Sequence, residues 1–349
     1  NREWSDADTT HLNIWLQRRC EGMRSISRHV IEHLPDHIAR INPFHAVRDY
    51  LGSLVWDGVP RLNGFAEGYL GAVAEDIMQQ HYLQSVCPRF FIGAVARVMQ
   101  PGCKMDTALI LESDMQGFKK STLFRALAVR DDWFSDTALE IGSKDGMQQL
   151  NGVWIYEMAE LEAVDRKSVN ANKQFMASQF DKFRPPYGRR VEKFMRQCVL
   201  VGSTNNQEYL RDKTGNRRYW PVTITARINL DFIRRDIHQL WAEAVHRYRT
   251  GEQWWFTDHE EIGARREQDD RLPHDDMTKE VLDAATMFRQ RLGIDRITLD
   301  QLIVELKFTA QIQDRHFKGR IGDILKRHGF RCVRPKLNNP RYERFYLYP

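Results

Sequence analysis

The feature that most constrains the fold is a short apolar run that passes through a polar turn into a helix. It lies in the segment LILESDMQGFKKSTLFRAL, from Leu109 to Leu127. Branched apolar side chains at 109–111 predict a buried strand, and the turn that follows contains Gly117. The turn ends in Lys120-Ser121-Thr122, where a helix is predicted to begin. This order is the outline of a phosphate-binding loop, in which backbone N–H groups at a helix start surround the phosphates.

In such a loop a lysine reaches the β- and γ-phosphates and a Ser or Thr hydroxyl binds Mg²⁺, and Lys120 and Ser121 stand in those places. Two positions that normally hold glycine hold Asp114 and Lys119 instead. A carboxylate at 114 that points at the phosphates would repel them, and Lys119 needs a backbone conformation that suits glycine better. The alternative interpretation is a solvated turn before a helix that Ser121 caps.

Two further apolar runs, at 153–156 and 198–201, are also followed by polar residues. Because these runs alternate with helical patterns from about His81 to Val222, we expect an α/β fold with mostly parallel strands. Ligands of such sheets bind beyond the carboxyl ends of the strands. Glu157 and Glu160 follow the second run, where they could hold the water shell of Mg²⁺ and polarise water, and Asn205 follows the third. Acidic residues at a helix start and asparagine in an ordinary turn are the alternatives.

Basic and aromatic residues alternate from Asp181 to Arg196, and Pro185-Pro186 with Gly188 predicts a hairpin turn. Such a loop suits single-stranded nucleic acid, because cations neutralise phosphates while bases stack on rings. A solvated basic loop is the alternative. The residues that would contact DNA are Arg184, Tyr187, Arg189, Arg190 and Lys193. Further on, Arg217 and Arg218 are either catalytic arginines that enter a neighbouring subunit's nucleotide site or structural ion-pair partners.

The regions on either side of this core are mainly helical. Breaks at Asn42-Pro43 and Asp57-Gly58 indicate a small helical N-terminal region, and a helix begins near Asp231 after the core. The charged stretch from His259 to Arg271 is expected to be a solvated connector. Three helices and a two-stranded hairpin then follow, which is the order of a winged-helix domain.

The C-terminal 49 residues, Gln301 to Pro349, carry eleven Lys and Arg against four Asp and Glu, which predicts polyanion binding. Arg315 and Lys318 would lie on the recognition helix, and Arg334 and Lys336 on the wing. Winged helices also serve protein–protein contacts, so the fold alone leaves the partner open.

Composition excludes several other classes of protein. The chain has 349 residues with 42% apolar content, lacks both a membrane-spanning apolar run and a signal-peptide pattern, and is expected to be cytoplasmic. Its five cysteines are too scattered for a zinc site or a disulfide framework. Because the first residue is Asn1 rather than Met, we expect a piece of a longer polypeptide.

Taken together and in this order, the segments resemble the virulence-associated protein E family, P-loop ATPases of phages, plasmids and genomic islands that are related to AAA+ and superfamily 3 helicases. The resemblance runs to about Tyr248. It rests on stretches such as Trp56-Asp57-Gly58-Val59-Pro60-Arg61, Pro101-Gly102-Cys103-Lys104-Met105-Asp106, Trp154-Ile155-Tyr156-Glu157 and Gly215-Asn216-Arg217-Arg218-Tyr219-Trp220-Pro221. The Glu112-Ser113-Asp114-Met115 segment and Lys119 depart from the glycine-bearing turn that the family commonly has.

The resemblance implies an α/β protein with a P-loop, AAA+-like ATPase core, a helical N-terminal region and a C-terminal winged-helix domain. The expected divisions are residues 1–75, 76–225, 226–276 and 277–349. ATP and Mg²⁺ would be the cofactors, with Ser121 and Glu157 at the metal and Glu157, Glu160, Asn205, Arg217 and Arg218 in catalysis. The ATP-binding loop would comprise Gln116, Gly117, Phe118, Lys119, Lys120, Ser121 and Thr122.

The leading hypothesis is the helicase and ATPase part of a mobile-element replication protein that forms a ring of about six subunits on single-stranded DNA. The winged helix would help to load it on duplex or origin DNA, and a primase domain could precede it. The alternative is a DNA-binding replication or packaging module whose nucleotide site is structural or inactive.

Overall fold

The computed structural model describes residues 5–19, 27–42, 44–158, 168–185, 190–210, 216–273, 275–333 and 345–349. The chain divides into two compact units. The first comprises Asn1–Gln207 and Thr214–Gln268, and the second comprises Glu208–Lys213 and Asp269–Pro349. In the described part of the chain, no helix combines the length and the apolar character needed to cross a membrane.

The first unit is built on a five-stranded sheet with the order β2-β3-β6-β1-β7. All of its pairings are parallel, as the alternation of apolar runs and helices predicted. Every residue of β1 is buried, as expected for a strand in a parallel sheet that is covered on both faces. The strands are β1 (Ala108–Glu112), β2 (Phe134–Ser135), β3 (Ile155–Met158), β6 (Val199–Thr204) and β7 (Tyr219–Thr223).

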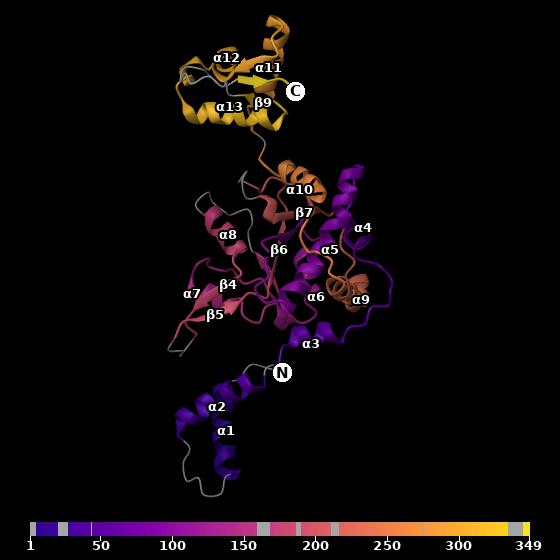
Figure 1. Ribbon diagram of the computed structural model, residues 1–349, viewed down its shortest axis with the longest axis vertical. Helices are drawn as coiled ribbons and strands as arrows, with labels where there is room; N and C mark the ends of the chain where they lie inside the picture. Colours follow the sequence, from indigo (N-terminus) through magenta and orange to yellow (C-terminus); the bar gives the residue numbers. More distant parts are fainter. Residues whose placement is uncertain are drawn as a thin grey trace. The chain divides into compact units, whose positions relative to one another are not determined.

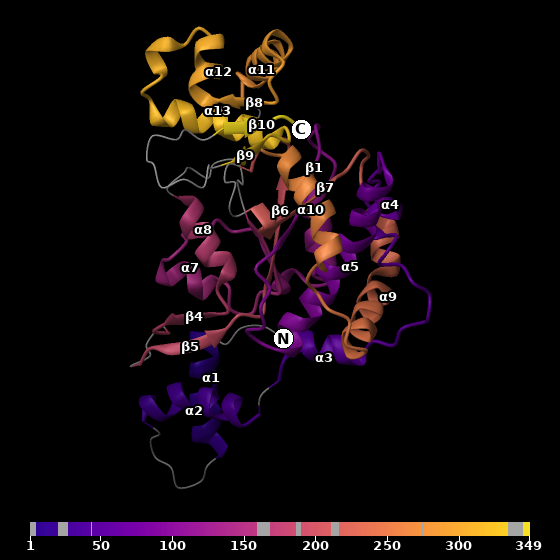
Figure 2. The same cartoon turned by 45° about the horizontal axis from the view of Figure 1, so that its top comes forward.

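Two long helices, α5 (Ile77–Met99) and α9 (Leu230–Arg249), lie side by side in the first unit, as Figure 1 and Figure 2 show. One indole ring links α5 to the residue before β3, and another links α9 to the end of the helix Lys120–Leu127. Trp154 donates to the carbonyl of Ala94 at 3.0 Å, and Trp241 donates to the carbonyl of Leu127 at 2.9 Å. The shorter helices are α3 (Ala46–Ser53), α4 (Phe65–Gly68), α6 (Lys120–Leu127), α7 (Lys144–Gln149) and α8 (Ser168–Ala177).

The N-terminal part is helical, as the sequence indicated: α1 (Asp6–Arg19) contacts α2 (Arg28–Ile41). The segment from Trp56 to Leu62, which precedes α4, is held by α9. The backbone N–H groups of Arg61 and Leu62 both donate to Oε2 of Glu243, at 2.6 and 3.0 Å, and this carboxylate is fully buried.

The predicted hairpin is present between α8 and β6. Strand β4 (Phe180–Phe183) pairs antiparallel with β5 (Glu192–Met195), and residues 186–189 of its turn lie outside the described residues. A buried ion pair fixes its base, because Arg196 donates from Nε and Nη2 to the two carboxylate oxygens of Asp181, at 2.8 and 2.7 Å. The base of the hairpin is therefore held by a buried ion pair, and Arg184 and Arg190, which lie on either side of the turn, are exposed.

The expectation of a solvated connector from His259 to Arg271 is wrong. The structure has a helix there, α10 (Asp258–Asp270). Its buried residues are spaced as one helical face, comprising Gly263, Ala264, Glu267 and Gln268. Small and polar side chains form that face, so hydrophobic periodicity could not reveal it.

In its described residues, the second unit contains three α-helices and a three-stranded antiparallel sheet with the order β8-β10-β9. Ile297, Ile321 and Tyr346 belong to its own apolar core. The three helices and the hairpin strands agree with the sequence prediction, whereas β8 was not expected. The elements are α11 (Thr278–Leu292), β8 (Arg296–Thr298), α12 (Leu299–Glu305), α13 (Arg315–Arg327), β9 (Arg331–Val333) and β10 (Phe345–Leu347).

Candidate functional site

The carboxyl edge of the parallel sheet brings three polar segments together. Glu112 at the end of β1 lies opposite Thr204 at the end of β6, and Glu157 of β3 lies opposite Val201 of β6. Ser113 and Asn205 directly follow these strand ends, so both stand at the edge where α6 begins. This is the place at which ligands of parallel sheets bind.

Lys120 is the first residue of α6, and its ammonium group points into this edge. Its Nζ donates to Oγ of Ser113 and to Oδ1 of Asn205, both at 2.6 Å, and the residue is only 8% exposed. Lys119 is only partly buried and adopts the left-handed backbone conformation, with φ of 64°, at a position where the loop normally has glycine. The two adjacent lysines therefore differ, and Lys120 is the one directed toward the site.

Glu157 lies beside two hydroxyl groups. Its Oε1 accepts from Ser121 at 2.8 Å and from Ser203 at 2.7 Å, whereas its Oε2 has no hydrogen-bond partner among the described residues. Burial raises the pKa of Glu157, and the hydrogen bonds from Ser203 and Ser121 partly offset that increase. A carboxylate held in this way is a stronger proton acceptor than one in water.

The remaining loop residues are more exposed. Gly117 has φ of 86°, which suits glycine, and Gln116, Gly117 and Thr122 are exposed, whereas Phe118 is half-buried. Asp114 accepts a hydrogen bond from the amide of Gln207. The structure therefore gives the Asp114 carboxylate a hydrogen-bond partner at Gln207.

The residues present fit Mg²⁺ and a polyphosphate. Oε2 of Glu157 is a buried acceptor without a partner among the described residues, and carboxylate and hydroxyl oxygens are ligands that hard divalent cations prefer. Lys120 supplies a cation beside the flexible turn at Gly117. Ser121, Glu157 and Ser203 would hold the metal directly or through water, and Lys120 would hold phosphate. Glu160 lies outside the described residues.

Arg217 and Arg218 lie at the other end of the sheet. Both belong to a short 3₁₀ helix, Asn216–Arg218, that directly precedes β7, and Tyr219 of β7 lies opposite Ala108 at the start of β1. A five-residue strand spans roughly 15 Å. The two arginines therefore stand apart from the loop of their own chain.

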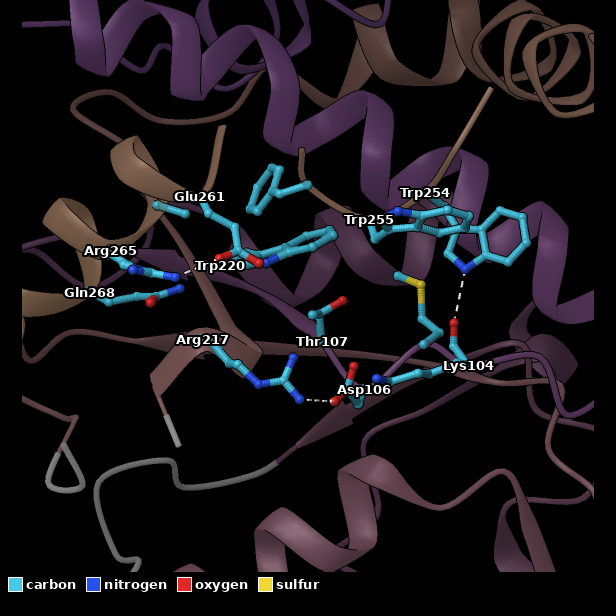
Figure 3. Close-up of a pocket in the computed structure, with 13 residues that line it drawn as sticks. Lys104, Asp106, Thr107, Arg217, Trp220, Trp254, Trp255, Glu261, Arg265 and Gln268 are labelled. Carbon is cyan, nitrogen blue, oxygen red and sulfur yellow. Dashed lines mark hydrogen bonds and ion pairs between the residues drawn. The ribbon is translucent and has the colours of Figure 1, made fainter. Parts of the chain in front are cut away.

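The two arginines also differ from each other. Arg217 is 55% exposed and donates from Nη2 to Oδ2 of Asp106 at 2.7 Å, whereas Arg218 is 14% exposed, with its Nε 3.9 Å from the same oxygen. Arg217 lines a cavity of about 450 Å³, which Figure 3 shows. Of the pair, only Arg217 has a guanidinium available to a partner.

The hairpin carries the exposed cations that the sequence predicted there. Arg184, Arg190 and Lys193 are exposed, and the ammonium of Lys193 lies 4.1 Å from the centroid of the Phe180 ring. Tyr187 and Arg189 lie outside the described residues. Cations and an exposed ring thus occur together on the described part of the hairpin.

In the second unit, part of the positive charge of α13 is neutralised. Lys318 forms an ion pair with Asp300. Nε and Nη2 of Arg320 donate to the two carboxylate oxygens of Asp275, each at 2.7 Å. Arg315 is exposed, while Arg334 and Lys336 lie outside the described residues.

Sequence reasoning missed three functional candidates. Ser113 appeared only in the segment that departs from the family pattern, and Ser203 only among the polar residues after the third apolar run, yet they contact Lys120 and Glu157. Their position at the ends of two predicted parallel strands could have indicated that they belong to the site. Asp106 was noted only within a matching stretch, because its partner Arg217 is 111 residues away in sequence.

The fold and the site define an α/β protein whose polar side chains converge at the carboxyl edge of a parallel sheet. Residues 51–273 match the Virulence-associated protein E-like domain, and the chain belongs to this family, which confirms the resemblance read from the sequence. A comparison with curated proteins found no match.

Among solved structures, "The apo structure of NrS-1 C terminal region" is similar at a TM-score of 0.44 with 10% identity. The match covers 85% of this chain and 77% of that one. "The A form apo structure of NrS-1 C terminal region-CTR" has a TM-score of 0.45 and 10% identity, with coverages of 86% and 78%.

Proposed function

We propose that the chain is the ATPase and helicase part of a DNA replication protein, with a P-loop core that forms a ring on single-stranded DNA. The observation that carries the proposal is the convergence of Lys120, Ser121, Glu157 and Asn205 at one edge of a parallel sheet. Family membership supports the same conclusion. ATP and Mg²⁺ are the proposed cofactors.

In this proposal each side chain has a separate task. Lys120 binds the β- and γ-phosphates, and Ser113 and Asn205 hold its ammonium group in place beforehand. Ser121 binds the metal, which when bound neutralises charge that develops on the phosphates. Glu157 accepts the proton of the attacking water, and its raised pKa favours this role.

Three other regions contribute to motor function. Arg217 stabilises charge in the nucleotide site of a neighbouring subunit, since it lies apart from the loop of its own chain. The hairpin β4–β5 contacts single-stranded DNA through its exposed cations and Phe180. The second unit acts as a winged helix that binds duplex DNA, for which the order of three helices and an antiparallel sheet is the support.

The test is ATP hydrolysis with and without single-stranded DNA, in the wild type, Lys120→Ala and Lys119→Ala. The adjacent lysine is the matched control, because Lys120 and not Lys119 donates the described hydrogen bonds to Ser113 and Asn205. We expect DNA-stimulated hydrolysis that disappears in Lys120→Ala and persists in Lys119→Ala. DNA binding without Lys120-dependent hydrolysis would instead favour a replication-assembly or packaging module with an inactive nucleotide site.

A further inference from the structure

The stretch Pro101-Gly102-Cys103-Lys104-Met105-Asp106 has no task in the proposed chemistry, yet it is firmly held. It lies between α5 and β1, and its last three residues, Lys104, Met105 and Asp106, line the same cavity as Arg217. Three consecutive carbonyls in it accept hydrogen bonds from side chains. These three hydrogen bonds hold the backbone of residues 103–105 in one conformation.

Two residues supply these donors. Arg97, which is 2% exposed, donates to the carbonyls of Cys103 at 2.9 Å and Met105 at 3.0 Å. Trp254 donates from its indole nitrogen to the carbonyl of Lys104 at 2.9 Å. The close contact with α5 adds to this, because a Cβ at Gly93 would lie 2.2 Å from the sulfur of Met105. The backbone immediately before Asp106 is therefore fixed on three sides.

Asp106 in turn holds Arg217. Its carboxylate is buried, and it accepts from Nη2 of Arg217, whereas Nη1 and Nε of Arg217 have no described hydrogen-bond partner. Figure 3 shows the Arg217 guanidinium directed toward Asp106, and the Trp254 indole directed toward the Lys104 carbonyl. A guanidinium has five N–H donors, so one bond to Asp106 fixes its position and leaves other donors for an anion.

We propose that Asp106 is the positioning residue for Arg217, and that the loop at 103–106, anchored by Arg97 and Trp254, sets where this arginine enters the nucleotide site of a neighbouring copy of the chain. The inference rests on the proposed function, because it needs a phosphate group for Arg217 to reach. It assigns a role to the Pro101–Asp106 stretch. Asp106 itself touches neither nucleotide nor metal.

The test compares steady-state ATP hydrolysis by the wild type, Asp106→Asn, Arg217→Ala and the double variant. Loss of a catalytic arginine lowers kcat by about 1,000-fold or more, and misplacement of a catalytic group by about 1 Å lowers it by about 100-fold. We expect Asp106→Asn to lower kcat with an unchanged KM, and the double variant to equal Arg217→Ala alone. Glu261→Gln is the matched control. It removes the charge that pairs with Arg265 in the lining of the same cavity and should leave kcat unchanged.

Mixing variants separates positioning from a structural defect. An Asp106→Asn subunit keeps its own phosphate loop, so a Lys120→Ala neighbour with an intact Arg217 should restore its hydrolysis. If Asp106→Asn fails to fold, Trp254→Phe replaces it, since it removes the donor to the Lys104 carbonyl, keeps an aromatic ring beside Tyr248 and Trp255, and should lower kcat only while Arg217 is present.

The inference is overturned if the losses from Asp106→Asn and Arg217→Ala multiply in the double variant, or if mixing gives no rescue while the wild type is active. A wild type without Lys120-dependent hydrolysis would overturn the proposed function first, and this inference with it.

Discussion

Replacing Glu157 by glutamine should stabilise the protein when nucleotide and metal are absent. The wild-type carboxylate is 4% exposed, and the described residues place two hydroxyl groups on Oε1 and nothing on Oε2. Glutamine keeps an acceptor for Ser121 and Ser203 and removes the buried charge. The substitution thus separates the electrostatic effect from the shape of the side chain.

The expected magnitude follows from opposing effects. Burying one ion costs several kcal/mol of folding free energy. The wild type regains part of this cost, because each hydroxyl hydrogen bond is stronger by about 1 kcal/mol to a carboxylate than to the neutral amide oxygen of glutamine. The amide N–H groups of glutamine would take the place of Oε2, which has no described partner, at a cost of about 1–3 kcal/mol. With two hydroxyls and this cost, Glu157→Gln should raise the free energy of unfolding by about 1 kcal/mol at about pH 8. For a domain of this size that corresponds to a rise in Tm of roughly 2–4 °C.

The increase in the free energy of unfolding that Glu157→Gln brings should be larger at high pH than at low pH. The pKa of Glu157 is higher in the folded protein than in the unfolded chain, so ionised Glu157 destabilises the fold above the raised pKa. As the pH falls to the ordinary carboxyl pKa, both states bind the proton and the penalty disappears. The advantage of Glu157→Gln should therefore shrink toward low pH.

The assay is thermal unfolding of the wild type, Glu157→Gln and the exposed control Glu140→Gln at about pH 8 and about pH 5. Adding Mg²⁺ with ATP should stabilise the wild type more than Glu157→Gln, because only the wild type offers a carboxylate to the metal. A Tm for Glu157→Gln equal to or below that of the wild type at pH 8, or a gain that does not change with pH, would refute the reasoning.

The remaining predictions concern the loop, the arginine and the hairpin. Lys119→Gly should keep hydrolysis and raise the free energy of unfolding by up to about 1 kcal/mol, because glycine accommodates the left-handed backbone; a loss of ATP binding would contradict this. Mixing Arg217→Ala with Lys120→Ala should restore part of the hydrolysis, whereas no rescue would favour a structural arginine. Arg184→Ala/Arg190→Ala should weaken single-strand binding and reduce the slope of log affinity against log salt by about 1.4; an unchanged slope would indicate a solvated loop.

The sequence predicted the parts of the fold that depend on apolar patterning. The three main strands and the helices of the second unit each carry a continuous apolar run or a clear periodicity, whereas the hairpin was predicted from its turn residues, Pro185-Pro186 and Gly188. Helix α10 was missed because Gly263, Ala264, Glu267 and Gln268 form its buried face, and none of these is strongly apolar. Burial of such a face depends on neighbours that the local sequence does not reveal.

The sequence predicted those site residues whose place is given by the order of strands and helices along the chain. Lys120, Ser121, Glu157 and Asn205 follow strand ends or begin a helix, and the parallel sheet brings them together. The sequence could not tell which groups hold them, so Ser113 and Ser203 emerged only in the structure. Nor could it distinguish Arg217 from Arg218, because their difference is one of burial.

The central claim is that Lys120 and Arg217 of neighbouring copies complete one nucleotide site in a ring around single-stranded DNA. The most direct test is an electron-microscopy image of the protein with a non-hydrolysable ATP analogue and single-stranded DNA. The account predicts closed rings with the strand in the central channel, and with Arg217 of each subunit beside the phosphate loop of the next. Particles that hold nucleotide and DNA as single copies, or that pair without bringing these two residues together, would contradict it.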